Sequence, residues 1–333
     1  RVGNRTFRCW KRGGHGTVDM KKAIAESCDV YFYRLAQRVG MDPIARMARK
    51  CGLGETYEIP VSSQFYGTVP DPNWKLAKYG EPWQAFDTVN STIGQGYMLA
   101  NPLQLAVSAA RIASGKLIQP QLVVDQLSSQ QSNAGFSSSD VSLVRDAMNE
   151  VVNGNGTAAG AKIPLPGIQM AGKTGTAQVV SLDYSDGKSG PRKYRDHGLF
   201  TFFAPFDNPR YAGAVVVEHG GGSASAYPIA KDLVTYLFDP QLGLEKLRAL
   251  ENVWGGTAQE RWVQDYRNYA KARGTDIPSK KEVDEEMQAL LEAEARLQSV
   301  EPPEPLTEAI APRPEINLIG GGTEGYRTES ALE

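Results

Sequence analysis

Three short segments with strand signals lie late in the chain, aromatic and β-branched residues dominate the last two, and together the three constrain the fold more than any other feature. They cover residues 170–182, 199–206 and 211–218, and only a short turn around Asn208-Pro209-Arg210 separates the last two. A connection this short joins antiparallel strands, because parallel strands need a long crossover. Apolar residues at helical spacing precede the strands, and residues 224–238 repeat that spacing after them. This order predicts an α+β fold in which helices flank an antiparallel sheet.

The helices before the strands can be placed from the same spacing. An apolar stripe from Met20 to Val39 predicts one helix, capped by Thr17 and ended by Gly40. Pro102 opens a second helix, residues 141–152 form a third that ends at Gly154, and residues 128–139 predict a Ser/Gln-rich surface connection. Residues 55–90 have no lasting period and predict a long functional loop. The sequence leaves open whether the aromatic residues of that loop line a groove or pack beneath it: Tyr66, Trp74, Tyr79, Trp83 and Phe86.

Charge divides the chain into two parts. Residues 245–333 contain 11 basic and 18 acidic residues, whereas residues 1–244 contain 25 and 20, so the net charges are −7 and +5. We expect a globular domain over 1–244 and an acidic tail over 245–333, helical at 261–273 and 280–298 and disordered beyond. The weak basic charge of the first part is too diffuse for a nucleic-acid binder. No run of 18 apolar residues occurs, and the opening at Arg1 predicts a fragment of a longer protein.

The segment Lys173-Thr174-Gly175-Thr176 lies inside the first predicted strand. A lone K-T-G triplet fits either a strand with one lysine reaching solvent or a strand edge beside a bound substrate. In the second case Gly175 permits close approach, Lys173 supplies charge, and the threonine hydroxyls and backbone N–H groups hold a carboxylate or an oxyanion. K-T-G accompanies an S-x-D or S-x-N element in penicillin-recognising serine acyltransferases. Ser27-Cys28-Asp29 supplies that element, 146 positions before Lys173.

Six separated motifs together resemble one family. They are, in order, W-K-x-G-G-H-G, S-C-D-x-Y-F-Y, I-G-Q-G-Y, A-G-K-T-G-T-A-Q-V, R-D-H and F-A-P-F. Over about residues 8–240 this order resembles the transpeptidase domain of the penicillin-binding protein 2 family, the class B peptidoglycan D,D-transpeptidases of bacterial cell elongation. The resemblance implies the penicillin-binding/serine β-lactamase-like fold, here incomplete at its N-terminus.

The resemblance also implies roles for the site residues. The catalytic residues would be Ser27, which relays protons, and Lys173, which keeps the site electropositive and hydrogen-bonds Ser27. The substrate-binding residues would be Asp29, Thr174, Gly175 and Thr176: the two threonines hold the terminal carboxylate of a D-alanyl-D-alanine stem peptide, and the Thr176 N–H forms half of an oxyanion hole. The reaction is serine acyl transfer that cross-links stem peptides, and β-lactam antibiotics would bind the same site.

One element of the family pattern is missing. The nucleophile of such enzymes lies in an S-x-x-K motif before S-x-D, and residues 1–26 contain none. The one match in the chain, Ser185-Asp186-Gly187-Lys188, follows K-T-G and is therefore a chance match. Without a nucleophile, covalent catalysis has no attacking group, so we expect this chain alone to be inactive. A sheet that lacks its first strands also predicts poor stability.

The cysteines indicate a second site. Cys9, His15 and Cys28 form the pattern C-x5-H-x12-C, and two thiolates with one imidazole suit tetrahedral zinc, which takes four ligands. The resemblance adds a zinc site near this position, with a fourth ligand from an upstream Asp or Glu. Two alternatives stay open: buried structural cysteines, or redox pairing of Cys9 with Cys28. Cys51 fits no motif and is expected to be buried, and His197 is expected to be structural.

The resemblance places the working enzyme at the periplasmic face of the bacterial inner membrane, held by an N-terminal anchor outside this chain. Its expected partners are a membrane glycosyltransferase and other proteins of the elongation complex. Two other functions are weighed against this one. A penicillin-fold module could bind peptidoglycan or a cell-wall partner without turnover. A β-lactamase is less favoured, since nothing in the chain resembles the deacylating glutamate element of that class.

Overall fold

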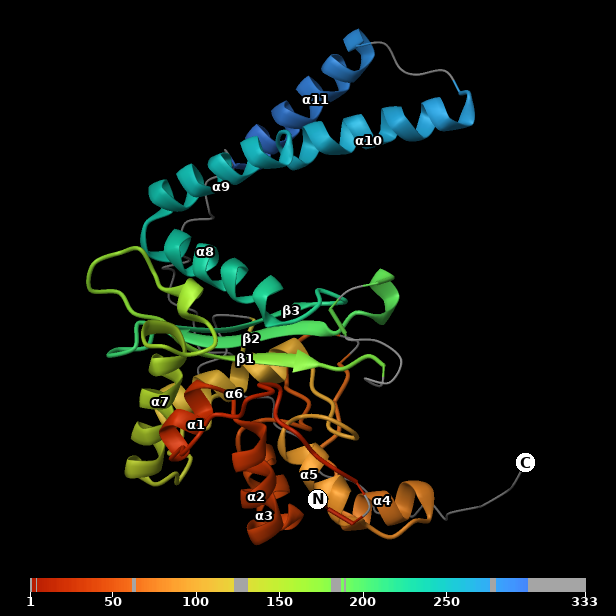
Figure 1. The fold of residues 1–333 in the computed structure, drawn as a ribbon. Helices are drawn as coiled ribbons and strands as arrows, with labels where there is room; N and C mark the ends of the chain where they lie inside the picture. The colour runs from red at the N-terminus through yellow and green to blue at the C-terminus, as the bar shows by residue number, and fades with distance from the viewer. Residues whose placement is uncertain are drawn as a thin grey trace, which may run out of the picture. The chain divides into compact units, whose positions relative to one another are not determined.

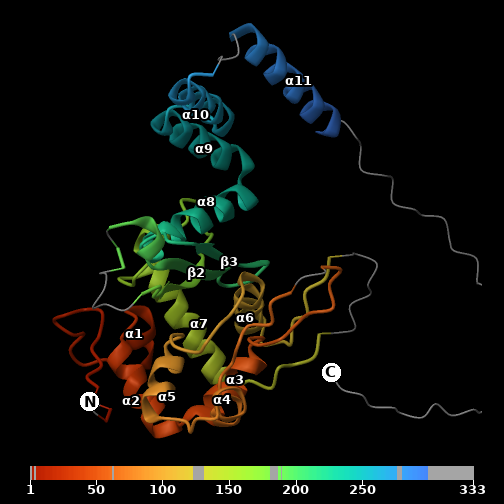
Figure 2. The same cartoon turned by 90° about the vertical axis from the view of Figure 1, so that its right-hand side faces the viewer.

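The three predicted strands form one antiparallel sheet in a computed structural model, which describes residues 2–3, 5–61, 64–122, 131–180, 187–188, 190–275 and 280–298. The strands are β1 (Ala171–Ala177), β2 (His197–Ala204) and β3 (Tyr211–Val217), in the order β1-β2-β3. The short turn between β2 and β3 makes the predicted hairpin. The α+β fold class is therefore confirmed, with helices on both faces of the sheet (Figure 1 and Figure 2).

The alternation of β2 side chains explains why both faces are covered. Phe200 and Phe202 point to one face, where they pack with α8 (Tyr227–Phe238) and the end of α7 (Ser138–Asn153). Phe203 points to the other face and packs with α6 (Pro102–Ser114) and α7. Gly172 of β1 lies against the Phe200 ring and leaves no room for a Cβ atom there. The strand that carries K-T-G is thus fixed closely on the core.

The predicted helix from Met20 to Val39 is wrong, because two helices replace it. They are α1 (Met20–Ala25) and α2 (Asp29–Val39), and α3 (Met41–Lys50) follows directly. Asp19, not Thr17, caps α1. The break between the helices lies at Glu26 and Ser27, whose carbonyls both accept hydrogen bonds from the Trp10 indole N–H. Helical spacing cannot reveal this break, because its support comes from a distant residue.

The long loop predicted for residues 55–90 is also wrong, since it contains α4 (Pro72–Tyr79) and the start of α5 (Ala85–Thr92). A buried ion pair joins the two helices, with Lys75 Nζ 2.8 Å from Asp87 Oδ2. Three of its aromatic residues are half-buried: Trp74 packs against Tyr97, Trp83 on the core around Met41 and Val69, and Phe86 beneath the Arg5 guanidinium. Tyr79 also contacts the Tyr97 ring but is exposed. Tyr66 stays exposed.

The described elements fall into two compact units, with the boundary between Gly255 and Gly256. The first ends with α9 (Pro240–Trp254), which packs on α8, so this boundary lies beyond the division at 244 drawn from charge. The second holds α10 (Ala258–Arg273) and α11 (Lys280–Gln298), both near their predicted positions. Short 3-10 turns are η1 (Ala159–Ala161), η2 (Arg192–Tyr194) and η3 (Ser223–Ser225).

No described helix combines the length and hydropathy needed to span a bilayer. The expected disordered end, residues 128–130, and Ser185 and Asp186 lie outside the described residues.

The unpaired edges of the sheet lead to a prediction about the thermal stability of the chain. Among the described strands, β1 and β3 each pair on one side only. Unpaired edges lower the net stability and invite association with other chains. We expect the 333-residue chain by itself to unfold below about 60 °C, within or under the usual range of mesophilic domains. The measurement is a thermal melt of the monomer followed by circular dichroism, and a sharp cooperative transition above that temperature would contradict the prediction.

Candidate active site

Ser27 occupies a backbone conformation that few residues adopt. Its φ is 55°, and among the described residues only His219 shares a positive φ without being glycine. The surrounding structure holds it there: its N–H donates to Ile24 O at 3.2 Å, and its carbonyl accepts the Trp10 indole N–H at 2.9 Å. Strained residues that their surroundings hold in place often lie at functional sites. The turn between α1 and α2 therefore presents the Ser27 hydroxyl at a fixed position.

Lys173 meets that hydroxyl from the sheet. Its Nζ donates to Ser27 Oγ at 3.0 Å and to the carbonyl of Thr174 at 2.9 Å. Burial lowers the pKa of Lys173 to about 8, and the nearby Asp29 carboxylate opposes that change. A lysine with such a pKa exists in both protonation states near neutral pH, so it can exchange a proton with a neighbouring hydroxyl. The structure thus brings together the two residues predicted to be catalytic.

A residue that the sequence analysis missed, Thr157, supports Thr174. The two hydroxyl oxygens lie 2.6 Å apart, and the Thr157 N–H donates to the carbonyl of Ala25 at 3.2 Å. Thr157 follows the turn Gly154-Asn155-Gly156 after α7, so it joins the K-T-G strand to the end of α1. The signal in the sequence was only this glycine-containing turn, which indicated the end of a helix and nothing more.

Thr176 lies at the open edge of β1. Its carbonyl accepts a hydrogen bond from Gln95 Nε2 at 2.8 Å, so this carbonyl faces away from β2. The N–H and C=O of one strand residue point to the same side, so the Thr176 N–H also faces outward. Its side chain is exposed, and a Cβ atom at Gly222 would lie 3.7 Å from its Oγ1. Gly175 allows close approach of Leu199 on β2. An outward N–H on the strand that carries Lys173 is suited to stabilise an oxyanion.

Asp29 and His197 have local partners in the structure. Asp29 is the first residue of α2, where its carboxylate accepts a hydrogen bond from the backbone N–H of Trp10 at 3.0 Å. A carboxylate at that position also interacts favourably with the helix dipole. His197 Nδ1 accepts the backbone N–H of His219 at 2.9 Å, which agrees with the structural role expected for it. Asp29 thus holds the turn beside Ser27 in place.

Cys9, His15 and Cys28 come together beside the same turn. Their ligand atoms lie within 4.8 Å of one another, and Cys9 Sγ is 3.4 Å from His15 Nδ1. All three cysteines of the chain are free thiols. Burial raises the pKa of the Cys28 thiol. His15 Nε2 is buried and has no hydrogen-bond partner among the described residues. Two thiols and an imidazole this close together fit a zinc ion, which takes sulfur and nitrogen ligands. His15 Nε2 also lies 3.9 Å from Glu26 Oε2.

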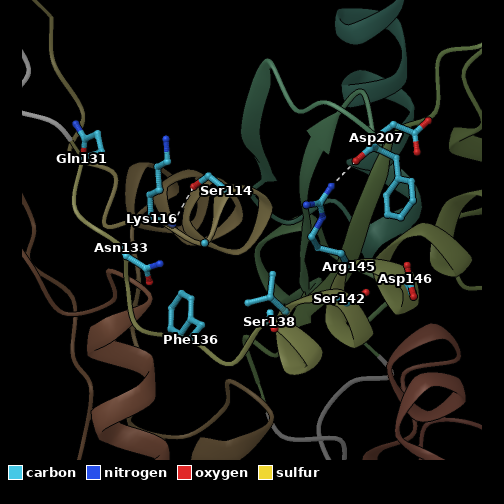
Figure 3. Close-up of a pocket in the computed structure, with 13 residues that line it drawn as sticks. Ser114, Lys116, Gln131, Asn133, Phe136, Ser138, Ser142, Arg145, Asp146 and Asp207 are labelled. Atoms are coloured by element: carbon cyan, nitrogen blue, oxygen red, sulfur yellow. Dashed lines mark hydrogen bonds between the residues drawn. The ribbon is translucent and has the colours of Figure 1, made fainter.

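A cavity of about 660 Å³ lies elsewhere, between α6, α7 and the turn after β2 (Figure 3). Lys116, Arg145 and Asp207 line it, and Arg145 donates to the carbonyl of Phe206 at 2.6 Å. None of the residues predicted to be catalytic or substrate-binding lines this cavity. The candidate site is instead the open surface where the α1–α2 turn, the loop after α5 and the edge of β1 meet.

Comparison with known proteins identifies the family. Residues 1–235 match the penicillin binding protein transpeptidase domain. The chain belongs to this transpeptidase family. Peptidoglycan D,D-transpeptidase MrdA of Acinetobacter baumannii is 38% identical over 245 residues, which are 69% of this chain and 36% of that protein. The enzyme of the same name from Salmonella typhimurium LT2 is 36% identical over 254 residues, or 71% of this chain and 41% of that protein.

Solved structures agree with the transpeptidase fold. Penicillin-binding protein 2 of Helicobacter pylori, solved in complex with MreC, has a TM-score of 0.64 and 34% identity, covering 72% of this chain and 43% of that chain. The Pseudomonas aeruginosa protein bound to WCK 5153 has a TM-score of 0.59 and 31% identity, covering 73% and 53%. The chain therefore spans about two fifths of the curated relatives named above. The resemblance predicted from the six motifs is confirmed.

Proposed function

We propose that this chain forms the K-T-G half of a peptidoglycan D,D-transpeptidase that cross-links stem peptides during cell-wall elongation. The hydrogen bond between Lys173 Nζ and Ser27 Oγ carries the proposal, since it joins two motifs 146 positions apart into one proton-exchanging pair. The similarity to MrdA proteins supports the reaction class. The nucleophilic serine would come from a segment outside these 333 residues, so the chain alone is inactive.

Each residue of the site has a chemical task in this reaction. The stem-peptide carbonyl would lie against the Thr176 N–H, which stabilises the negative oxygen formed when the serine attacks. Ser27 would pass the proton of the nucleophile to the departing D-alanine amine, while Lys173 stabilises the negative charge around it. Thr174 and Thr176 would bind the terminal carboxylate, and Thr157 keeps the Thr174 hydroxyl oriented. Attack by the amine of a neighbouring stem peptide then completes the cross-link.

Zinc would be held by Cys9, His15 and Cys28, with a fourth donor from outside the three. Its contribution would be structural: the ion would link the segment before α1 to Cys28, the N-cap residue of α2, next to Ser27. The grouping of one imidazole with two thiols, whose ligand atoms all lie within 4.8 Å of one another, supports this assignment over two structural cysteines. The free state of both thiols gives no support to a disulfide between Cys9 and Cys28.

The setting of the enzyme is proposed from its relatives. The Helicobacter pylori protein was solved with MreC, and a further relative of 26% identity and TM-score 0.52 belongs to a peptidoglycan synthase complex for polymerization and crosslinking. A polymerising glycosyltransferase and elongation-complex proteins are therefore the proposed partners, at the periplasmic face of the inner membrane. β-Lactam antibiotics are the proposed inhibitors.

Covalent labelling by a fluorescent penicillin tests the proposed function. The 333-residue chain should remain unlabelled, whereas the full-length protein that supplies an S-x-x-K segment should be labelled at one serine, identified by mass spectrometry. The matched control is the full-length protein with that serine changed to alanine. If the full-length protein stays unlabelled while a synthetic stem peptide still binds it, the non-catalytic module would be favoured instead.

A further inference from the structure

The loop after α5 presents one side chain to the active site, and the mechanism above does not use it. α5 ends at Thr92, and Gly94 and Gly96 follow with φ of 76° and 69°. Both glycines adopt the left-handed conformation, so they fold the chain into a tight turn around Gln95. The Gln95 N–H donates to the carbonyl of Asn90 at 3.0 Å, which fixes the turn to the end of the helix. Gln95 is thus held on a rigid support and not on a long flexible loop.

The carboxamide of Gln95 pairs with the open edge of β1 as a peptide group would. Its Nε2 donates to Thr176 O at 2.8 Å, and its Oε1 accepts the Gln178 N–H at 3.3 Å. Both partners are backbone groups with fixed roles, one accepting and one donating, so the orientation of the amide is determined. One side chain therefore occupies a carbonyl and an N–H that would otherwise be free to pair with an added strand.

An acyl donor would compete for one of these two groups. In an antiparallel pairing, a residue whose carbonyl lies against the Thr176 N–H directs its own N–H to the Thr176 carbonyl. The carbonyl attacked in the proposed reaction is the one against the Thr176 N–H, so the amide N–H of the same residue faces Thr176 O. Gln95 Nε2 holds that position in the structure. The second group, the Gln178 N–H, does not have to pair with such a donor.

We propose that Gln95 is a specificity-determining residue that occupies the amide position of the acyl donor at Thr176 O and must leave it before a donor with an N–H can pair there. The inference rests on the proposed function and adds a determinant of substrate choice. The ligands concerned are acyl compounds that carry a secondary amide next to the reacting carbonyl. Compounds without that N–H form no new hydrogen bond when Gln95 withdraws, because they have no group to donate to Thr176 O.

The test compares two acylating agents that differ in whether the side-chain amide nitrogen carries a hydrogen or a methyl group. Benzylpenicillin carries a side-chain amide N–H beside its reacting ring, and its N-methyl analogue does not. Second-order acylation rate constants are measured for the full-length protein and for its Gln95→Ala and Gln95→Glu variants. Gln95→Glu can still accept from Gln178 but cannot donate to Thr176, so it keeps the loop tied to the strand. Gln241→Ala, on the exposed face of α9, serves as the matched control.

Both Gln95 variants should raise the ratio of the benzylpenicillin rate to the N-methyl rate about threefold to tenfold, the effect of one hydrogen bond. Gln241→Ala should leave the ratio unchanged. An unchanged ratio in both Gln95 variants, or an equal fall of both rates, would overturn the inference, since Gln95 would then only hold the end of β1. If the unaltered protein reacts with neither compound, the proposed function fails, and the two failures are thereby distinguished.

Discussion

Replacing Lys173 by alanine in the full-length protein is expected to slow acylation by penicillin at least about 100-fold, comparable to the loss of one oxyanion-hole donor. The reason is the position of its ammonium group, 3.0 Å from Ser27 Oγ and 2.9 Å from the Thr174 carbonyl. The substitution removes a charged donor from the proton-exchanging pair. It should change the free energy of unfolding little, because the low pKa of Lys173 shows that the folded site does not favour its charge.

Lys173→Arg is the matched variant, because arginine keeps the charge and changes the geometry of the donors. Partial activity should remain in it. The measurement is the acylation rate of the three proteins at equal folded concentration. Equal rates in all three would mean that the K-T-G strand is structural and that the site is assigned to the wrong place.

The pH dependence follows from the same group. The pKa of Lys173 is about 8 in the folded protein and about 10.5 for an ordinary lysine. Its charge is lost as pH rises through 8, so acylation that needs this charge should fall on the alkaline side of that value. Between the two pKa values the unfolded chain binds the proton and the folded one does not, so the contribution of this group to stability rises with pH there. In Lys173→Arg the alkaline fall in rate should disappear.

Replacing Cys28 by alanine is expected to abolish metal binding. If the cluster binds zinc, the protein should contain about one ion per chain by elemental analysis, and the variant close to none. A site whose dissociation constant lies about 1,000-fold below the free zinc concentration stabilises the folded state by about 4 kcal/mol. For a domain of this size that energy corresponds to roughly 10 °C in melting temperature.

Cys51→Ala is the control for this experiment, because Cys51 is also a free cysteine but lies outside the cluster. It should keep its zinc. Addition of a strong chelator should lower the melting temperature of the unaltered protein and leave Cys28→Ala unchanged. A protein purified with added zinc that holds no metal would show that the three residues are only packed together.

Much of the fold could be predicted because the strands carry local signals. The aromatic and β-branched residues of β2 and β3, and the short turn between them, placed both strands within about two residues of their observed bounds. The helix break at Ser27 could not be predicted from local spacing, because the Trp10 side chain supports it from 17 positions away. The same holds for the buried pair of Lys75 and Asp87, which stabilises helices where the lack of a lasting period had indicated a loop.

In the candidate site, too, some residues could be predicted from the sequence and others could not. Its motifs were visible as short strings, and the structure brings Ser27 next to Lys173 as the resemblance implied. Thr157 and Gln95 were not assigned, because each acts through contact with a strand that is distant in sequence. Thr157 lies 17 positions from Thr174, and Gln95 lies 81 positions from Thr176. A single sequence does not show such pairs.

The long separations within the site also determine when it forms during folding. The β2–β3 hairpin closes a short loop, whereas the contact of Ser27 with Lys173 closes one of 146 residues, whose entropy cost is larger. Contacts of this range form late and slow the approach to the native state. Refolding protein should therefore acquire its strand signal before it acquires any capacity to bind a β-lactam. Antibiotic binding would report the last step of folding and would miss every earlier intermediate.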